Sequence, residues 1–295
     1  MKIHHLSLAT MCPYGGRLLS GEAGDGLAPA ELVIHALLVE TGDRLVLVDT
    51  GLGLEDIRSP MRRLSPGFVL AMRPRLREED TAVRQIERLG FSASDVSDVV
   101  LTHLDVDHVG GIPDFPRATI HVNRAEHTAA MARMTMLEVQ RYRGVHYAHG
   151  PRWQLHDPGG DRWFGFESAR AIGDDVVIVP VIGHTRGHAA IAVRQPAGGA
   201  SDWLLHCGDA YFFHGQMSDR PHCPVGLEAF QLAMAFDNTV RRANVARLRA
   251  LRLQQDARVT MFSAHCPYEL RAMMASNVGA KAAGAKVAGA KAAVA

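Results

Sequence analysis

The sequence has little cysteine, no marked excess of charge of either sign and no long apolar run. Its 295 residues include four cysteines without Cys-x-x-Cys spacing, so we expect reduced thiols. The formal net charge of +1 provides no global attraction to nucleic acid or to acidic partners. No apolar run is long enough to span a bilayer, and the first ten residues lack the apolar centre of a signal peptide. We therefore expect a cytoplasmic protein with neither membrane nor nucleic-acid partners.

Histidine, in contrast, is abundant, and several of the 16 histidines are clustered with carboxylates. An apolar run at 99–101 predicts a short buried strand, and it is followed by the segment His103-Leu-Asp105-Val-Asp107-His108. His103 and Asp105 share a face if the segment is extended, whereas the adjacent Asp107 and His108 diverge toward a second position. Four potential ligands within six positions indicate a site for two divalent cations, which would offset the repulsion between the carboxylates.

Strands and helices alternate along most of the chain, which predicts an α/β protein. We expect strands at 2–9, 32–40, 44–49, 99–101, 118–122, 175–182, 189–194, 203–207 and 258–263, and helices at 80–89, 124–142 and within 226–254. Residues 52–78 are predicted to form a mobile loop or short helix near the mouth of the site, and residues 144–173 are predicted to be irregular. Residues 1–275 would form one domain, and the Gly-Ala-Lys repeats of 276–295 predict a disordered tail.

The ligand segment resembles the metal-binding signature of the metallo-β-lactamase superfamily, His-x-His-x-Asp-His, with Asp105 in place of the second histidine. Over residues 30–270 the other motifs of the family follow in the expected order: Val48-Asp49-Thr50-Gly51, Gly187-His188, Gly208-Asp209 and His265. Each follows a predicted strand, where open sheets place their chemistry. The resemblance implies a four-layer αββα sandwich that binds two divalent metal ions.

The resemblance also implies a role for each motif residue. The ligands of the first metal would be His103, Asp105 and His188, those of the second would be Asp107, His108 and His265, and Asp209 would bridge both. Asp49 would orient the ligands without binding metal, and for His184 we expect a supporting or solvated role. Zinc is the favoured ion. Iron or manganese is the alternative, because Asp105 adds a carboxylate where flavodiiron proteins carry glutamate.

The activity implied by the resemblance is hydrolysis of a small ester or lactone, such as an acyl-homoserine lactone, by a metal-activated hydroxide. Asp107 and Tyr211 are the predicted catalytic residues, although acyl-homoserine lactonases typically carry their tyrosine one position later. Apolar residues of 61–72 could form an acyl-binding wall, and the lactonase branch suggests a homodimer. The alternatives are a thioesterase resembling glyoxalase II, a β-lactamase, a phosphodiesterase, a di-iron oxidoreductase and a non-catalytic metal-binding protein.

Overall fold

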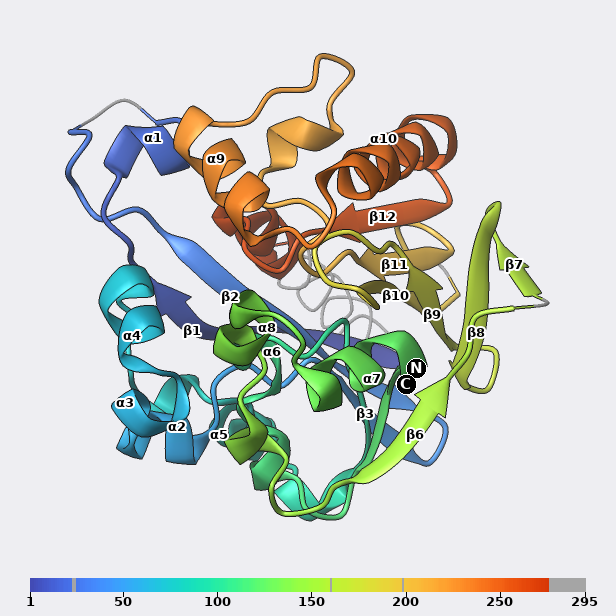
Figure 1. Ribbon diagram of the computed structural model, residues 1–295. Coiled ribbons are helices and arrows are strands. Elements are labelled where there is room, and N and C mark those ends of the chain that lie inside the picture. Colours follow the sequence, from blue (N-terminus) through green and yellow to red (C-terminus); the bar gives the residue numbers. More distant parts are fainter. Residues whose placement is uncertain (23–24, 160, 198, 276–295) are drawn as a thin grey trace, which may run out of the picture.

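Two six-stranded β-sheets form the centre of the molecule (Figure 1). The computed structural model describes residues 1–22, 25–159, 161–197 and 199–275, so the predicted disordered tail lies outside the described residues. The first sheet contains, in spatial order, β1 (Lys2–Met11), β2 (Leu32–Thr41), β3 (Arg44–Val48), β4 (Val96–Val100), β5 (Thr119–Asn123) and β6 (Arg152–His156). The second contains β12 (Val259–Phe262), β11 (Trp203–His206), β10 (Ala189–Arg194), β9 (Val176–Pro180), β8 (Phe166–Ile172) and β7 (Asp161–Trp163).

Both sheets are mixed. In the first sheet, β1, β2 and β3 pair antiparallel and β3 to β6 pair parallel. In the second sheet, the β11–β12 pair is parallel and the other pairs are antiparallel. The parallel strands β3 and β4 therefore end at the same edge of the first sheet, as β11 and β12 do in the second. These edges carry the loops that contain the ligand motifs.

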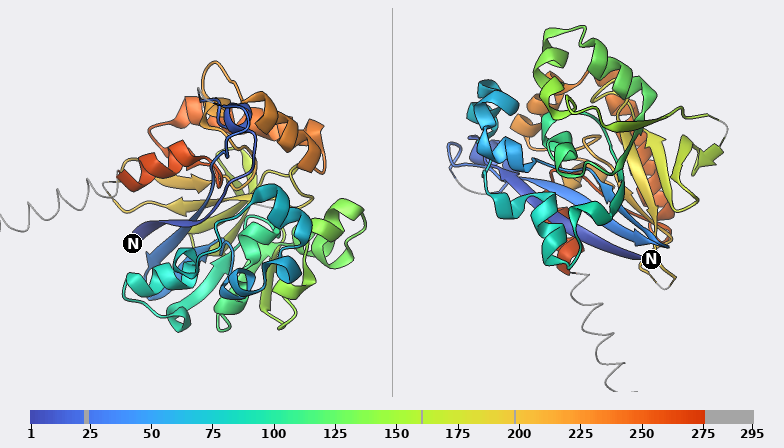
Figure 2. Two further views of the ribbon diagram at one scale, coloured as in Figure 1. Left: turned by 90° about the vertical axis from the view of Figure 1, so that its left-hand side faces the viewer. Right: turned by 90° about the horizontal axis from the view of Figure 1, so that it is seen from below.

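Helices cover the outer faces of the two sheets (Figure 2). Their bounds are α1 (Gly16–Ser20), α2 (Leu54–Arg58), α3 (Pro60–Arg63), α4 (Pro66–Met72), α5 (Ala82–Arg88), α6 (Val106–Val109), α7 (Arg124–Ala132), α8 (Met136–Arg141), α9 (Val225–Met234) and α10 (Asn238–Gln255). A further helical stretch covers 267–275. Among the described residues, none of the helices combines the length and apolar character that a membrane crossing would need.

The apolar side chains form three layers of core because successive residues of a strand point to opposite faces. In β3, Leu45 and Leu47 pack against the helices outside the first sheet, whereas Val46 and Val48 point between the sheets. Outside the second sheet, Leu248 of α10 packs on the strands. Strands buried on both faces have near-continuous apolar sequences, as these do. The result is the predicted αββα sandwich.

Two predicted helices are each interrupted in the structure. The helix predicted at 124–142 is divided into α7 and α8, because Arg133 adopts a left-handed conformation (φ 45°) that ends α7 and Thr135 then caps α8. The helix predicted within 226–254 is divided into α9 and α10, with Asp237 accepting a hydrogen bond from Val240 N as the cap of α10. In both cases a local cap outweighs the helical periodicity.

Residues 144–173 contain most of the remaining differences, whereas the short helices found within 52–78 match one of the two alternatives predicted there. Residues 144–173, predicted to be irregular, contribute β6, β7 and β8. β6 and β7 are edge strands whose residues are mostly partly exposed, so they lack the continuous apolar signal of the central strands. Residues 52–78 form the short helices α2, α3 and α4. The four cysteines are free thiols, as predicted.

Candidate metal centre

The candidate site lies where the loops following β3, β4, β11 and β12 meet the loop between β9 and β10. The loop after β4 carries His103, Asp105, Asp107 and His108, the last two within α6. All side chains of this segment are buried, although carboxylates and imidazoles are normally exposed. Their burial is a consequence of the parallel pairing of β3 with β4, which brings this loop over the sheet edge.

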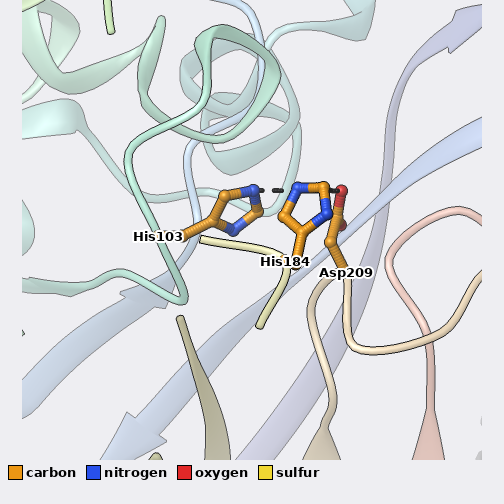
Figure 3. Close-up of side chains that lie close together, drawn as sticks. All are labelled: His103, His184 and Asp209. Atoms are coloured by element: carbon orange, nitrogen blue, oxygen red, sulfur yellow. Dashed lines mark ion pairs between the residues drawn. The ribbon is translucent and has the colours of Figure 1, made fainter. Parts of the chain in front are cut away.

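Two groups of three side chains have the spacing of metal ligands. His103, His184 and Asp209 form one group, and Asp107, His108 and His265 form the other, with ligand atoms within 4.8 Å of one another in each. Figure 3 shows the first group, whose three side chains converge from three separate loops. The second group matches the residues predicted for one metal, whereas the first contains His184 in place of His188 and does not include Asp105.

Asp209 lies between the two groups. One carboxylate oxygen, Oδ1, is 3.2 Å from His108 Nε2, and the other, Oδ2, is 3.5 Å from His184 Nε2 and 3.8 Å from His103 Nε2. His265 Nε2 is 3.1 Å from the same carboxylate. A carboxylate in this position can bind one cation with each oxygen.

The hydrogen bonding of these side chains fits a metal site. His103 Nε2, His108 Nε2 and Asp209 Oδ1 are buried and have no hydrogen-bond partner. Buried polar atoms are ordinarily paired, so three unpaired lone-pair donors facing one another need a ligand that accepts electron pairs. Burial alone would raise the pKa of Asp209, but His265 and His108 hold it well below the ordinary value, and in turn Asp209 helps to raise the pKa of His108 against the effect of burial. A bound cation would take the place of the imidazole protons in this arrangement.

Asp49 contacts the ligand segment on the side away from the pocket and binds Thr102 and His108. Its Oδ1 accepts from Thr102 N at 2.8 Å, and its Oδ2 lies 2.8 Å from His108 Nδ1. Asp49 itself has a left-handed backbone (φ 57°), a costly conformation that marks a position under functional constraint. Burial would raise the pKa of Asp49, but the neighbouring His108 lowers it to about 2. These contacts confirm that Asp49 touches the ligand segment, and they direct His108 Nε2 toward the centre.

Asp105 forms an ion pair with an arginine that the sequence analysis did not identify. Arg141, the last residue of α8, places Nη2 2.9 Å from Asp105 Oδ2 and donates from Nη1 to His184 O at 2.9 Å. Asp105 Oδ2 is also 3.1 Å from His184 Nε2 and 3.4 Å from His103 Nε2. Burial would raise the pKa of Asp105, but Arg141 and His103 hold it well below the ordinary value. The carboxylate is therefore charged and lies at the edge of the first ligand group.

Glu126 of α7 connects the loops that carry the first ligand group. Its fully buried carboxylate accepts from Leu104 N and Tyr142 Oη, each at 3.0 Å. The other oxygen accepts from Thr185 Oγ1 at 2.6 Å and Gly187 N at 2.9 Å. Glu126 thus connects the segments that carry His103, Arg141 and His184. Each of its two carboxylate oxygens accepts two hydrogen bonds.

A pocket of about 410 Å³ opens over these ligands. Its floor includes Asp107, Asp209 and His265, and its wall is largely apolar, formed by Met11, Phe68, Met72, Leu137, Phe212, Phe230 and Met234. Of the five apolar residues predicted to form an acyl-binding wall, Phe68 and Met72 line this pocket, Val69 packs against the core outside the first sheet, and Met61 and Leu70 are exposed. Such a pocket suits a small molecule with one polar and one apolar end.

Comparison with known proteins decides the family. The metallo-beta-lactamase superfamily model matches residues 30–260. The chain belongs to this superfamily. A probable metallo-hydrolase from Mycobacterium tuberculosis is 42% identical over 270 residues, covering 90% of this chain and 81% of the relative. An N-acyl homoserine lactonase from Azorhizobium caulinodans is 29% identical over 176 residues, covering 60% and 65% respectively. The chain is therefore a metal-dependent hydrolase of the metallo-beta-lactamase superfamily.

Two solved lactonase structures show the same fold. An N-acyl homoserine lactone hydrolase with the product N-hexanoyl-L-homoserine at its catalytic metal centre superposes with a TM-score of 0.69, at 20% identity over 92% of this chain and 95% of that one. AidC, a dizinc quorum-quenching lactonase, gives a TM-score of 0.59 at 17% identity, covering 90% and 87%. At these identities the likeness concerns the fold alone.

The segment 183–188 contains two histidines, His184 and His188 of the Gly187-His188 motif, and their side chains make different contacts. His188 Nε2 accepts a hydrogen bond from Asp209 N at 2.9 Å, and His188 Nδ1 is 3.2 Å from Val181 O. Both ring nitrogens of the predicted ligand are thus occupied by the backbone. His184 instead points into the first group, and burial together with Arg141 lowers its pKa to about 4, which keeps it neutral as a ligand must be. The spacing of the two histidines in the sequence does not tell them apart.

Tyr211, which the sequence predicts to be catalytic, does not line the pocket. Its hydroxyl is buried in the core outside the second sheet and donates to Glu269 at 3.0 Å. Burial and the Glu269 charge raise its pKa well above the ordinary value. The next residue, Phe212, lines the pocket and stacks on His265 with ring centroids 4.9 Å apart. This geometry does not support a catalytic role for Tyr211.

Proposed function

We propose that this protein hydrolyses small esters or lactones that carry an apolar acyl chain, with two divalent ions held at the pocket floor. One observation carries the proposal: a single pocket of about 410 Å³ has an apolar wall and a floor of metal-ligand side chains. Several of the ligand atoms at this site are buried without a hydrogen-bond partner. The lactonase relatives support the same substrate class.

The ligand groups suggest which residues would hold each ion. One ion would be held by His103, His184 and Asp209 with Asp105 beside them, and the other by Asp107, His108 and His265, with Asp209 shared. The donor set of imidazoles and carboxylates suits zinc, with iron or manganese as alternatives. Ions of this kind lower the pKa of water and polarise a carbonyl, which is the chemistry that ester hydrolysis at neutral pH requires.

The residues of the chain would supply positioning, water exclusion and proton transfer. The apolar wall, including Phe68 and Phe230, would hold the acyl chain and exclude water from it. Asp107 lines the pocket and would take the proton of the attacking water and return it to the oxygen of the leaving group. The resemblance to acyl-homoserine lactonases implies a tyrosine one position after Tyr211, and this chain has Phe212 there. We therefore expect the protein to act without a phenol hydroxyl at this point.

The test compares four substrates on one metal-loaded sample: a γ-lactone with a hexanoylamino chain, the same lactone without that chain, a thioester and a phosphodiester. We expect the largest kcat/KM for the lactone, at least about 10-fold above that for the same lactone without its acyl chain, because several buried methylenes each contribute about 0.8 kcal/mol. His108→Ala should remove at least about 99% of the activity. The matched control His149→Ala changes an exposed histidine outside the pocket and should leave activity unchanged. Preference for the phosphodiester, or no lactone hydrolysis, would overturn the proposal.

A di-iron oxidoreductase is the second candidate, and the extra carboxylate of Asp105 is the observation that favours it. Arg141 weakens this argument because its charge offsets that of Asp105. The oxidised, iron-loaded protein would then show a visible absorption band and react with oxygen or peroxide. Lactone hydrolysis by the zinc-loaded protein, without oxygen consumption by the iron form, would exclude this candidate.

A further inference from the structure

Arg141 is a buried cation beside the first ligand group. Its side chain is 3% exposed, and its Nη2 lies 2.9 Å from Asp105 Oδ2 and 3.1 Å from His184 Nε2. A buried charge is costly unless it is paired, and Asp105 provides the pairing. A second contact, from Nη1 to His184 O, fixes the guanidinium against the loop that carries His184. The position of Arg141 is therefore set by the site.

The charge of Arg141 balances the charge that distinguishes this chain from the usual signature. The usual signature has a neutral histidine where this chain has Asp105. The site therefore contains three carboxylates, of Asp105, Asp107 and Asp209, and one guanidinium. Their net charge of −2 equals that of two carboxylates alone. The Asp105–Arg141 pair is thus electrostatically equivalent to the histidine that it replaces.

The pair is not equivalent to a histidine as a ligand. Arg141 occupies Oδ2 of Asp105, the oxygen that faces His103 and His184, while Oδ1 is buried without a hydrogen-bond partner. The guanidinium also stands 3.1 Å from the His184 nitrogen that faces Asp209, where it would repel a bound cation. In the second group, the ion-pair contacts of Asp107 within the described part of the chain are with histidines only. The two positions therefore differ in the charge next to them.

We propose that Arg141 determines the metal affinity of the first position. Together with Asp105 it takes the place of a neutral histidine ligand, and it makes the position formed by His103, His184 and Asp209 the weaker and more exchangeable of the two. This inference rests on the two-ion assignment of the proposed function. It identifies Arg141 as a positioning residue that acts through Asp105 and His184.

The test measures metal affinity and does not depend on substrate. Zinc is titrated into chelator-treated full-length protein against a competing indicator, and metal content is measured after dialysis. We expect two ions in the wild-type protein, with stepwise dissociation constants at least about 10-fold apart. Arg141→Met removes the positive charge at similar length, so the weaker dissociation constant should fall about 10-fold. Asp105→Asn should raise that constant by a similar factor and leave the tighter one unchanged.

Three further variants keep the test informative. Asp105→Asn combined with Arg141→Met restores the wild-type net charge, so its weaker constant should lie between those of the single variants. Arg141→Lys keeps the charge and should retain a weak first position. Arg143→Met is the matched control, because Arg143 contacts Arg62 O outside the pocket, and it should change neither constant. Circular dichroism checks that each variant is folded.

The outcomes separate this inference from the proposed function. If the folded wild-type protein binds no ion, the proposed function fails. If it binds two ions and Arg141→Met leaves the weaker constant unchanged or raises it, this inference alone is overturned. If Arg141→Met does not fold, a weaker constant in the double variant Asp105→Asn/Arg141→Met equal to that of Asp105→Asn would overturn it, because removing the Arg141 charge would then have no effect.

Discussion

The Glu126 carboxylate provides the sharpest prediction about how the fold holds the site. It is fully buried and accepts four hydrogen bonds, two of them from the backbone N–H groups of Leu104 and Gly187. Glu126→Gln keeps the size of the side chain but replaces one acceptor oxygen with an NH₂ group. The hydroxyls of Tyr142 and Thr185 can rotate to accept from that group. A backbone N–H cannot, so in either amide orientation one buried N–H faces another donor.

The magnitude follows from these contacts. One unsatisfied buried donor costs about 1–3 kcal/mol, and the remaining bonds weaken because they lose a charged acceptor. We expect Glu126→Gln to lower the free energy of unfolding by about 2–4 kcal/mol. Urea denaturation at pH 7 of the chelator-treated protein measures this without a contribution from bound metal.

A control and a second readout complete the experiment. Glu87→Gln changes an exposed carboxylate that pairs with Arg84, and it should leave the urea midpoint unchanged. Because Glu126 joins the loops of the first ligand group, Glu126→Gln should also weaken zinc binding at the weaker position more than at the tighter one. A free energy of unfolding within about 0.5 kcal/mol of the wild-type value, with unaltered zinc binding, would refute this reasoning.

Three further predictions test other parts of the structure. Tyr211→Phe removes the donor to Glu269, so the free energy of unfolding should fall by about 1 kcal/mol in urea denaturation while kcat/KM changes less than about threefold; a large loss of kcat at unchanged stability would contradict this. Gly187→Ala places a Cβ 2.1 Å from the Glu126 backbone nitrogen, so thermal unfolding should show a loss of at least about 2 kcal/mol, and a wild-type Tm would contradict the close packing. Burial would raise the pKa of Asp98, but hydrogen bonds from His121 and Ser97 lower it from 3.8 to about 2. Asp98→Asn should therefore cost about 1–2 kcal/mol at pH 7, and the difference from wild type should shrink as pH falls from 4 toward 2 in urea titrations; a constant difference would contradict the lowered pKa of Asp98.

The local part of the site could be predicted because its residues are close in sequence. His103, Asp107 and His108 follow one strand within a few positions, so their clustering does not depend on long-range packing. The central strands could be predicted for a related reason: burial on both faces leaves continuous apolar runs.

The sequence alone was enough to predict a metal-dependent hydrolase. The types of the ligand residues, and their order after successive strands, can be recognised without knowing how the loops fold. Only the tertiary structure decided which side chains face the centre. His184 and His188 are four residues apart, and Tyr211 and Phe212 are adjacent, so composition and spacing treat each pair alike. The direction of each side chain is set by contacts from distant segments, such as Asp209 N on His188 and Glu269 on Tyr211. Arg141 reaches Asp105 across 36 positions of chain, and the packing of α8 over the β4 loop brings this counter-charge to the metal centre.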